Sequence, residues 1–350
     1  MDFIDLRSDT ITQPVTEMRR HMAEADVGDD VFGEDPTVNA LQDKICELTG
    51  KEAALFVTSG TQANQIAINA HTQPGDEVIC EYRSHIFNYE AGAPALLSGV
   101  QVHPIQGEHG ILQPAQIEEV IRPRDHHFPV SRLIGLENTH NRWGGVIYPL
   151  EAIKEMRTFA DNQNLLMHLD GARLWNASAA TGIPIKTYAS YFDSVSLCFS
   201  KGLGAPVGSV IAGNERFIER AHYYRKVYGG GMRQAGIIAA GALYALEHHT
   251  GRLMEDHIRA RKLAEELNML TGLVIDLQRV QTNIVIIDTS LSGIPANEFE
   301  ALLSQNHVRM KAISPSRLRA VTHLQISDDD IKHTINAFKN ILKHQHSLVD

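Results

Sequence analysis

An apolar run breaks into glycines at Ser196-Leu197-Cys198-Phe199-Ser200-Lys201-Gly202-Leu203-Gly204, and a lysine stands at the break. A lysine at the end of a buried strand, surrounded by small residues, can lose its proton and condense with a carbonyl group. That chemistry suggests pyridoxal phosphate. A single lysine in a strand-to-hairpin loop is more often simply solvated, so the interpretation depends on the residues that accompany Lys201.

An acidic residue follows a second apolar run, where Leu165-Leu166-Met167-His168-Leu169 leads into Asp170-Gly171-Ala172-Arg173. At the carboxyl end of a parallel strand, such a residue points into the crevice where open α/β sheets bind ligands. An aspartate there can pair with a pyridinium nitrogen and keep it protonated, which makes the ring an electron sink. Aspartate is equally favoured as a helix N-cap, so both interpretations of Asp170 remain open.

A small, hydroxyl-bearing turn follows the third apolar run, residues 53–57, and reads Thr58-Ser59-Gly60-Thr61-Gln62. Free backbone amides and the positive end of a helix dipole at such a turn form a phosphate site, although an ordinary capped turn has the same pattern. The turn has neither the Gly-Lys-Ser/Thr of a Walker loop nor the Gly-x-Gly-x-x-Gly of a dinucleotide fold.

Short apolar runs alternate with helical segments along most of the chain, which is typical of an α/β protein. Strands are expected at residues 53–57, 77–80, 100–104, 133–137, 165–169, 194–199 and 207–212. Helices between most of them predict crossover connections and a mainly parallel sheet of seven strands. The last two strands, separated by a glycine-rich turn, are candidates for antiparallel neighbours. Helices are expected at residues 14–25 and at 36–49, the latter capped by Asp35 and ended by Gly50.

The alternation of short apolar runs with helical segments changes near Arg252. An alanine-rich helix at 237–248 and a charged helix at 253–270 precede the remaining segments. Apolar runs follow at 273–277, 284–287, 308–311 and 321–326, with helices expected at 296–305 and 328–343. We therefore predict a large domain at residues 1–251, which includes the N-terminal segment, and a smaller C-terminal α+β domain at residues 252–350.

Composition narrows the class of protein. A chain of 350 residues is long enough for two such domains, and its net charge of −10 argues against a nucleic-acid partner. Cys46, Cys80 and Cys198 form no Cys-x-x-Cys pair, so we expect reduced thiols. The acidic opening at Met1-Asp2 is unlike a signal peptide, and no apolar run approaches the ~20 residues that cross a bilayer. We expect a cytoplasmic protein with no membrane partner.

Seven blocks of sequence resemble, in the same order, those of the low-specificity L-threonine aldolases. They read DLRSDT from Asp5, VGDDVFGEDPTV from Val27, TSGTQANQ from Thr58, ENTHNR from Glu137, HLDGAR from His168, GGGMRQAG from Gly229 and RAVTH from Arg319. The blocks span nearly the whole chain. The resemblance implies the aspartate aminotransferase-type fold, fold type I, with pyridoxal 5'-phosphate held between the domains.

The same resemblance implies roles at the cofactor ring. Lys201 would carry the cofactor, and Asp170 would pair with its pyridine nitrogen. His85 would stack its imidazole on the ring. Without the resemblance, His85 would more simply be a residue at the start of a helix.

Further residues are implied at the cofactor phosphate. Gly60 and Thr61 would hold it, with help from Ser200 beside the lysine. Lys226 and Arg233 would approach the phosphate of a neighbouring subunit, because the family builds its site across a dimer, commonly a dimer of dimers. The glycines before Arg233 could instead form a hinge.

A substrate amino acid presents its carboxylate to fixed cations, and guanidinium groups bind it bidentately. By resemblance, Arg173, Arg319 and Ser8 form this clamp, with Arg173 close enough to Asp170 to share the cofactor site. Tyr89 stands where some relatives have phenylalanine near the substrate β-carbon, which could change the preference between threo and erythro substrates. Phe32 replaces a tyrosine of many relatives, so any role of that hydroxyl is absent.

The resemblance implies retro-aldol cleavage of L-threonine or L-allo-threonine to glycine and acetaldehyde. A base must remove the β-hydroxyl proton, and the candidates are His85, His127 and a bound water. His127 is followed by Phe128, as is the family histidine that approaches the substrate hydroxyl. The chain has no His-Glu-x-x-His motif, so a catalytic metal is not indicated.

Two alternatives remain open. A related fold type I lyase, acting by β-elimination or on phenylserine-like β-hydroxy amino acids, would share the same cofactor residues. A non-enzymatic regulator would keep the fold, but it would not need Lys201, Asp170 and both arginines.

Overall fold

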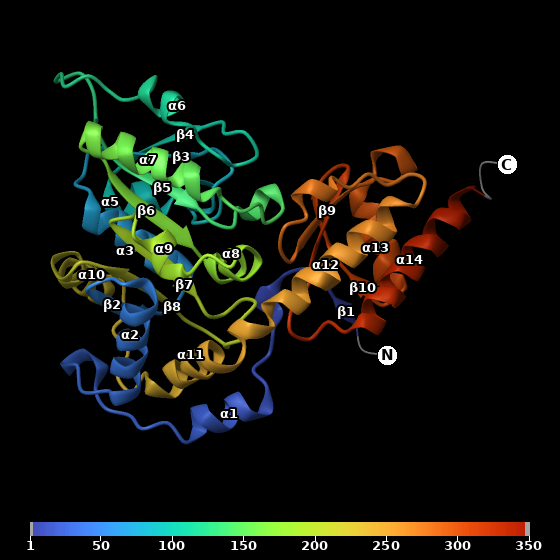
Figure 1. Ribbon diagram of the computed structural model, residues 1–350, viewed down its shortest axis with the longest axis horizontal. Helices are drawn as coiled ribbons and strands as arrows, with labels where there is room; N and C mark the ends of the chain where they lie inside the picture. The colour runs from blue at the N-terminus through green and yellow to red at the C-terminus, as the bar shows by residue number, and fades with distance from the viewer. Residues whose placement is uncertain (1–2, 347–350) are drawn as a thin grey trace.

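The computed structural model describes residues 3–346, apart from the side chains of residues 344–346. Met1 and Asp2 of the acidic opening, and residues 347–350 at the end of the expected C-terminal domain, lie outside this range. Figure 1 shows two bodies of unequal size, with helix α12 (Leu253–Asn268) leading from the larger to the smaller.

A seven-stranded sheet is the centre of the larger body. Its strands are β2 (Ala53–Val57), β3 (Asp76–Glu81), β4 (Gln101–Ile105), β5 (Val130–Glu137), β6 (Leu166–Gly171), β7 (Ser194–Cys198) and β8 (Ser209–Gly213). They lie in the order β2-β8-β7-β6-β5-β3-β4, and only the pairs that include β8 are antiparallel. The expected mainly parallel sheet and its antiparallel last pair are confirmed.

Helices cover both faces of this sheet, with one large apolar cluster on one face and two smaller clusters on the other. One face carries α2 (Pro36–Thr49), α6 (Pro114–Glu118), α7 (Leu150–Gln163), α8 (Leu174–Thr181), α9 (Ile185–Ala189) and α11 (Gly236–His248), with α1 (Thr16–Ala23) packed on α11. The other carries α3 (Gly60–His71), α4 (His85–Asn88), α5 (Ala93–Ser98) and α10 (Glu215–Val227). None of the helices in the described range is long and apolar enough to cross a membrane.

The smaller body has its own sheet and core. Its sheet has the antiparallel order β11-β12-β9, from β9 (Ile284–Asp288), β11 (Lys311–Ser314) and β12 (Arg317–Val321). Helices α12, α13 (Ala296–Gln305) and α14 (Asp328–His346) pack on it. Short turns of 3-10 helix occur at η1 (Asp9–Ile11), η2 (Asp30–Phe32), η3 (Asn141–Trp143), η4 (Thr250–Arg252), η5 (Leu277–Arg279) and η6 (Ser290–Ser292).

The N-terminal segment packs with the smaller body, although the sequence assignment placed it in the large domain. Strand β1 (Ile4–Asp5) pairs in parallel with β10 (Val308–Arg309), and Leu6 is buried in the core of the smaller body. The side chains of α12 join both cores, since Leu253 belongs to the first and Leu263 to the second. The division at residues 251 and 252 stays a prediction.

Two expected strands of the smaller body were misplaced. Residues 273–277 form no strand, and Val274 makes only an isolated bridge to Asp288. The strand expected at 321–326 instead covers Arg317–Val321, where it pairs with β11 and β9. Arg317 and Arg319 alternate with the buried Leu318 and Ala320, so this strand contains no continuous apolar run.

Helix α2 has the bounds expected from its caps. The Asp35 carboxylate accepts hydrogen bonds from the backbone N–H groups of Thr37 and Val38 at 3.1 and 3.0 Å. It also accepts one from Gly236 at the start of α11, at 2.8 Å. Gly50 ends the helix with φ at 68°, in the left-handed region that glycine adopts without strain. Asp35 therefore joins two helices through one buried carboxylate.

Replacing Asp35 by alanine is expected to lower the stability of the larger body by roughly 2–4 kcal/mol, because a helix cap is lost and the buried N–H groups of Val38 and Gly236 lose their acceptor. The midpoint of the first thermal unfolding transition measures the change. Asp43→Ala, an exposed position on the same helix, is the control and should leave this midpoint nearly unchanged. Equal midpoints for the two variants would contradict the role of Asp35.

Candidate active site

The carboxyl ends of β2, β5, β6 and β7 meet at one edge of the large sheet, where open α/β sheets bind ligands. A cavity of about 110 Å³ opens there. Seven of the residues expected at the cofactor line it together: Gly60, Thr61, His85, Asp170, Arg173, Ser200 and Lys201. Segments far apart in the sequence thus contribute to one site.

Lys201 stands three residues after the end of β7, at the floor of this cavity. Its backbone carbonyl accepts hydrogen bonds from Gly204 N and from Thr12 Oγ1, at 2.8 and 3.1 Å, which fix the turn. Among the described residues, none forms a hydrogen bond or ion pair with its Nζ atom. The amino group is therefore held in place by its backbone but remains free to react.

Asp170 is buried beside the lysine, near the end of β6. Its carboxylate accepts hydrogen bonds from Asn64 Nδ2 at 2.8 Å and from Ala172 N at 3.1 Å. Burial alone would raise the pKa of Asp170, but the charges of His85 and Lys201 and the Asn64 bond outweigh it and lower the pKa. Asp170 is therefore an ionised carboxylate that can keep a ring nitrogen protonated.

Asn64 connects this carboxylate to a second one. Its Nδ2 also donates to Glu90 Oε1 at 2.9 Å, and its Oδ1 accepts from Ser196 Oγ at 2.9 Å. Gln65 donates to the other oxygen of Glu90, and both Asn64 and Glu90 are almost fully buried. The sequence prediction missed Asn64 and Glu90, although Asn64 lies in the TSGTQANQ block and Glu90 closely follows His85.

His85 is fixed by two carboxylates. Its Nδ1 lies 2.7 Å from Glu90 Oε1, and its backbone N donates to Glu137 Oε2 at 2.7 Å. Burial lowers the pKa of His85, but the hydrogen bond to Glu90 and the charge of Asp170 outweigh it, so the pKa is raised. Because a carboxylate only accepts, Nδ1 carries a proton and leaves Nε2 as the nitrogen that can gain or lose one.

A chain of buried polar groups ends at Asn64 Oδ1 and fixes the orientation of the Asn64 amide. Its Oδ1 lies 3.2 Å from His168 Nε2, and Ser194 Oγ lies between His168 Nδ1 and His71 Nε2 at 2.8 and 2.7 Å. Burial lowers the pKa of His168 to about 4 and that of His71 to about 3, so both rings are neutral. Since Asn64 Oδ1 is an acceptor, His168 Nε2 is the donor, and the Asn64 amide is held with Nδ2 toward the carboxylates.

The first turn of α3 supplies the anion site expected at the phosphate. Ser59 caps the helix through Gln62 N at 3.1 Å, and the N–H groups of Gly60 and Thr61 have no intrahelical acceptor. A Cβ atom on Gly60 would lie 2.7 Å from Cys198 Sγ, so only glycine lets the helix approach β7 this closely. Ser200 lines the same end of the cavity.

These residues fit pyridoxal phosphate. The cavity offers a free lysine amine, an ionised aspartate and an anion site at a helix N-terminus, which match the three parts of the cofactor. The hydroxyl of Thr139, which lines the cavity, is buried without a hydrogen-bond partner among the described residues. A bound polar group would satisfy it.

Arg173 enters the cavity from the start of α8, but it is paired. Its Nε and Nη2 atoms donate to the two oxygens of Asp9 at 2.8 and 2.6 Å. Burial alone would raise the pKa of Asp9, yet Arg173 lowers it to about 2. Asp9 also accepts from Asn283 Nδ2 of the smaller body at 3.2 Å, so this ion pair joins the N-terminal segment to both bodies.

Arg319 lies close to this pair. It donates from Nη1 to Asn141 Oδ1 and from Nη2 to the carbonyl of Arg7, both at 3.0 Å, next to Ser8. Its Nε is buried without a hydrogen-bond partner within the described range. Burial and the neighbouring charge of Arg173 lower the pKa of Arg319 to about 10. Two adjacent guanidinium groups of this kind favour an anion between them.

Tyr89 lies at the mouth of the site. Its ring centroid is 5.7 Å from that of His85, the Arg142 guanidinium is 5.8 Å from the Tyr89 ring, and half of the side chain is exposed. Phe32 is 72% exposed beside Arg233 and does not line the cavity.

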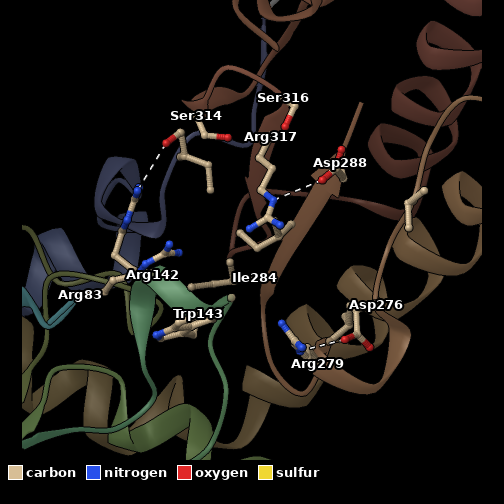
Figure 2. A pocket seen from close by; sticks show the side chains of 15 residues that line it. Arg83, Arg142, Trp143, Asp276, Arg279, Ile284, Asp288, Ser314, Ser316 and Arg317 are labelled. Atoms are coloured by element: carbon tan, nitrogen blue, oxygen red, sulfur yellow. Dashed lines mark hydrogen bonds and ion pairs between the residues drawn. The ribbon is translucent and has the colours of Figure 1, made fainter. Parts of the chain in front are cut away.

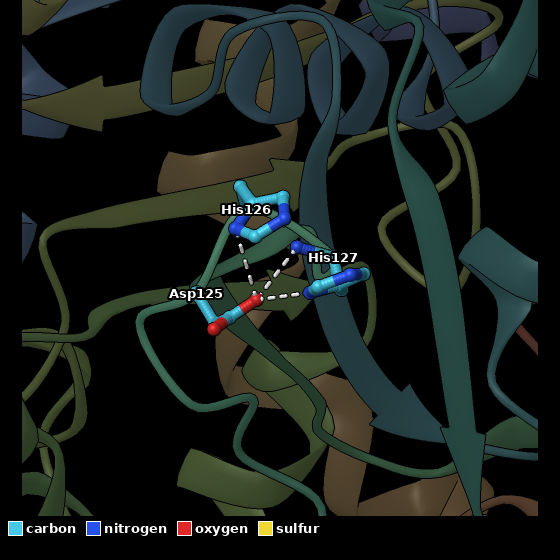
Figure 3. Close-up of side chains that lie close together, drawn as sticks. All are labelled: Asp125, His126 and His127. Atoms are coloured by element: carbon cyan, nitrogen blue, oxygen red, sulfur yellow. Dashed lines mark hydrogen bonds and ion pairs between the residues drawn. The ribbon is translucent and has the colours of Figure 1, made fainter.

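The structure does not bring His127 into the cavity of its own subunit. His127 lies on the exposed loop before β5, where its Nδ1 and that of His126 face one oxygen of Asp125 at 2.5 and 3.5 Å (Figure 3). Strand β5 is eight residues long, which places this loop roughly 25 Å from the Glu137 end that lines the cavity. A residue that precedes a parallel strand lies at the wrong edge of the sheet for that site.

Lys226 and Arg233 also lie outside the cavity. Both side chains are exposed, and Arg233 pairs with Asp29 at 2.9 Å. Gly230, which lies between them, packs against the first turn of α3, since a Cβ on Gly230 would lie 2.2 Å from Gln62 Nε2.

A family model and the sequences of known proteins indicate the same family for this chain. Residues 5–290 match the beta-eliminating lyase family. The low specificity L-threonine aldolase of Escherichia coli K12 is 43% identical, with 94% of this chain and 96% of that protein covered. Low-specificity L-threonine aldolase 1 of Arabidopsis thaliana is 41% identical, with 98% and 97% covered.

Solved structures agree on the fold. A threonine aldolase of Leishmania major superposes with a TM-score of 0.84 at 20% identity, covering 97% of this chain and 99% of that one. An aromatic aminotransferase of Pyrococcus horikoshii superposes with a TM-score of 0.73 at 15% identity, covering 99% and 97%. The expected fold type I is confirmed, and the protein is a pyridoxal phosphate enzyme. The chain therefore belongs to the beta-eliminating lyase family, among its low-specificity L-threonine aldolases.

Proposed function

We propose that this protein cleaves L-threonine and L-allo-threonine into glycine and acetaldehyde. The observation that carries the proposal is the position of two arginines, the buried Arg173 in the cavity wall and the half-buried Arg319 near it, beside a free lysine amine and an ionised aspartate. The relatives named above are threonine aldolases over nearly their whole length. Bound pyridoxal phosphate supplies an electron sink for the broken Cα–Cβ bond.

Lys201 and Asp170 hold the two ends of the cofactor ring in this proposal. The Lys201 amine would hold the cofactor at its aldehyde carbon, with loss of water, and the Asp170 carboxylate would keep the ring nitrogen protonated. Gly60 and Thr61 donate backbone N–H groups to the phosphate, and Ser200 adds a hydroxyl.

Arg173, Arg319 and Ser8 bind the substrate carboxylate. Asp9 fixes the Arg173 guanidinium through two hydrogen bonds and leaves its Nη1 for the substrate. A carboxylate held by both arginines orients the Cα–Cβ bond relative to the ring, and that orientation decides which bond breaks.

His85 is the base that best fits the β-hydroxyl proton. Glu90 holds its Nδ1 proton, so Nε2 takes the proton from the substrate. Tyr89 lies beside it and is positioned to contact the substituent on the β-carbon. His127 of the same subunit lies too far away, which favours His85 or a bound water.

We further propose that the protein acts as a homo-oligomer, a dimer of dimers in which Lys226 and Arg233 approach the cofactor of a neighbouring subunit. Both side chains are exposed, and Phe32, Tyr223 and Val227 expose 72, 66 and 57% of their surface near them. The three cysteines are free thiols, which supports a cytoplasmic location, where the reaction would consume threonine and supply glycine.

The holoenzyme is expected to release acetaldehyde and equimolar glycine from L-threonine. Alcohol dehydrogenase and NADH measure the aldehyde, and amino-acid analysis measures the glycine. Lys201→Ala should lose turnover, whereas Lys154→Ala, an exposed lysine paired with Glu151, should retain it. Formation of 2-oxobutyrate and ammonia instead would show β-elimination, and the proposed cleavage would be wrong.

Arg319→Gln is expected to raise KM for L-threonine roughly 10- to 100-fold, because a charge-assisted contact to the substrate carboxylate is lost. The effect on kcat should be smaller. Steady-state kinetics measure both, with Arg261→Gln on exposed α12 as the control. A KM within twofold of the parent enzyme would exclude Arg319 from the clamp.

Glu90→Gln is expected to move the acidic limb of the kcat/KM profile to lower pH. Glu90 raises the pKa of His85, so removal of its charge lets the imidazole lose its proton at lower pH. The unprotonated His85 imidazole then persists to lower pH. Glu118→Gln, an exposed carboxylate, is the control. An unmoved limb, or one moved to higher pH, would contradict the assignment of His85 as base.

A further inference from the structure

A second and larger cavity, of about 470 Å³, lies between the two bodies and away from Lys201. One wall comes from the segment around η3 of the larger body, and the other from the small sheet and the loop before it (Figure 2). Its volume is in the range of cavities that hold small organic ligands. None of the residues assigned above to the cofactor or the substrate lines it.

The wall from the larger body carries uncompensated positive charge. Arg83 and Arg142 both line it, and neither guanidinium group forms an ion pair in the part of the chain that the structure describes. The Arg83 backbone N donates to Glu81 Oε2 at 2.6 Å, and its Nε donates to the Tyr82 hydroxyl. Arg83 stacks 4.6 Å from the Trp143 ring centroid, which holds its guanidinium in place. Trp143 in turn donates to Glu81 Oε1 at 3.2 Å, so this wall is rigid.

The opposite wall is electrically neutral and partly apolar. Its two arginines are already paired, Arg279 with Asp276 at 2.8 Å and Arg317 with Asp288 at 3.3 Å, as Figure 2 shows. Ile284 and Ile286 of β9 also line this wall of the cavity. Among the described residues, the cavity therefore offers two guanidinium groups without an ion-pair partner on one side and a partly apolar surface on the other.

We propose that this cleft binds a small carboxylate with an apolar body, its head group between Arg83 and Arg142 and its body against Trp143 and Ile286. Guanidinium groups bind carboxylates bidentately, and an aromatic and aliphatic surface suits a hydrocarbon body rather than a second charge. The site is distinct from the amino-acid site and does not depend on the proposed reaction.

A ligand in this cleft would contact both bodies at once. Arg142 already donates to the carbonyl of Ile313 across the cleft at 3.4 Å. Its neighbour Asn141 accepts from Arg319 at 3.0 Å, so segment η3 has the cleft on one side and the substrate arginine on the other. A ligand bound in the cleft is therefore expected to affect the position of the Arg319 side chain through Asn141.

Trp143 provides a direct test, because the chain has only two tryptophans and the other, Trp175, is buried in the large core. In the Trp175→Phe holoenzyme, 3-phenylpropionate should change the fluorescence of Trp143 saturably. 3-Phenylpropanamide lacks the carboxylate, and inorganic phosphate lacks the apolar body. Each should bind at least tenfold more weakly than 3-phenylpropionate. The visible band of the bound cofactor should stay unchanged in the same samples.

Two variants locate the ligand. Arg83→Gln should weaken binding of 3-phenylpropionate at least tenfold. Ser314→Glu adds a carboxylate at an exposed position that lines the cleft and leaves Arg83 in place. It should weaken binding at least tenfold as well. Arg216→Gln, an exposed arginine on α10, should have no effect. A cofactor band that shifts in step with the fluorescence would place the ligand in the active site and overturn the proposal. So would no saturable response, or equal affinity in Ser314→Glu.

Discussion

Burial of two carboxylates side by side, Asp170 and Glu90, is the constraint on which the site depends. Among the described residues, neither forms an ion pair with a lysine or arginine. Their charges are balanced by hydrogen bonds, by His85 and, for Asp170, by the nearby charge of Lys201. One amide, that of Asn64, donates to both. Because His168 fixes the orientation of that amide, the two carboxylates cannot move independently. The ring-nitrogen partner and the base that we propose are therefore parts of one hydrogen-bonded unit.

The ion pair between Arg173 and Asp9 connects this hydrogen-bonded unit to the rest of the molecule. Arg173, three residues after Asp170, is held by Asp9 of the N-terminal segment, and Asp9 accepts from Asn283 of the smaller body. The N-terminal segment runs along the small core through Leu6 before it reaches the large sheet. Movement of the smaller body would therefore be transmitted to Arg173 as well as to Arg319, which lies on β12. The proposed clamp is the part of the site most sensitive to the relative position of the two bodies.

Local patterns were sufficient to predict the large sheet, because each of its strands is a continuous apolar run between helices with recognisable caps, such as α2 between Asp35 and Gly50. They failed in the small sheet, where Arg317 and Arg319 interrupt the run of β12. Lys201, Asp170 and Gly60 could be proposed because each ends a strand or begins a helix at the same sheet edge. Asn64 and Glu90 could not, since their role depends on contacts between α3, α4 and β6 that no local pattern encodes. His127 was suggested by resemblance alone, and the fold places its loop at the opposite end of β5 from the cavity of its own subunit, so its role stays a prediction.

The central claim is that Lys201 is the residue that carries the cofactor. Borohydride reduction of the holoenzyme, followed by proteolysis and mass spectrometry, tests it most directly, because reduction fixes the cofactor to the lysine that holds it. One modified peptide is expected, with pyridoxal phosphate on Lys201. Attachment to any other lysine, such as the exposed Lys226, would contradict it.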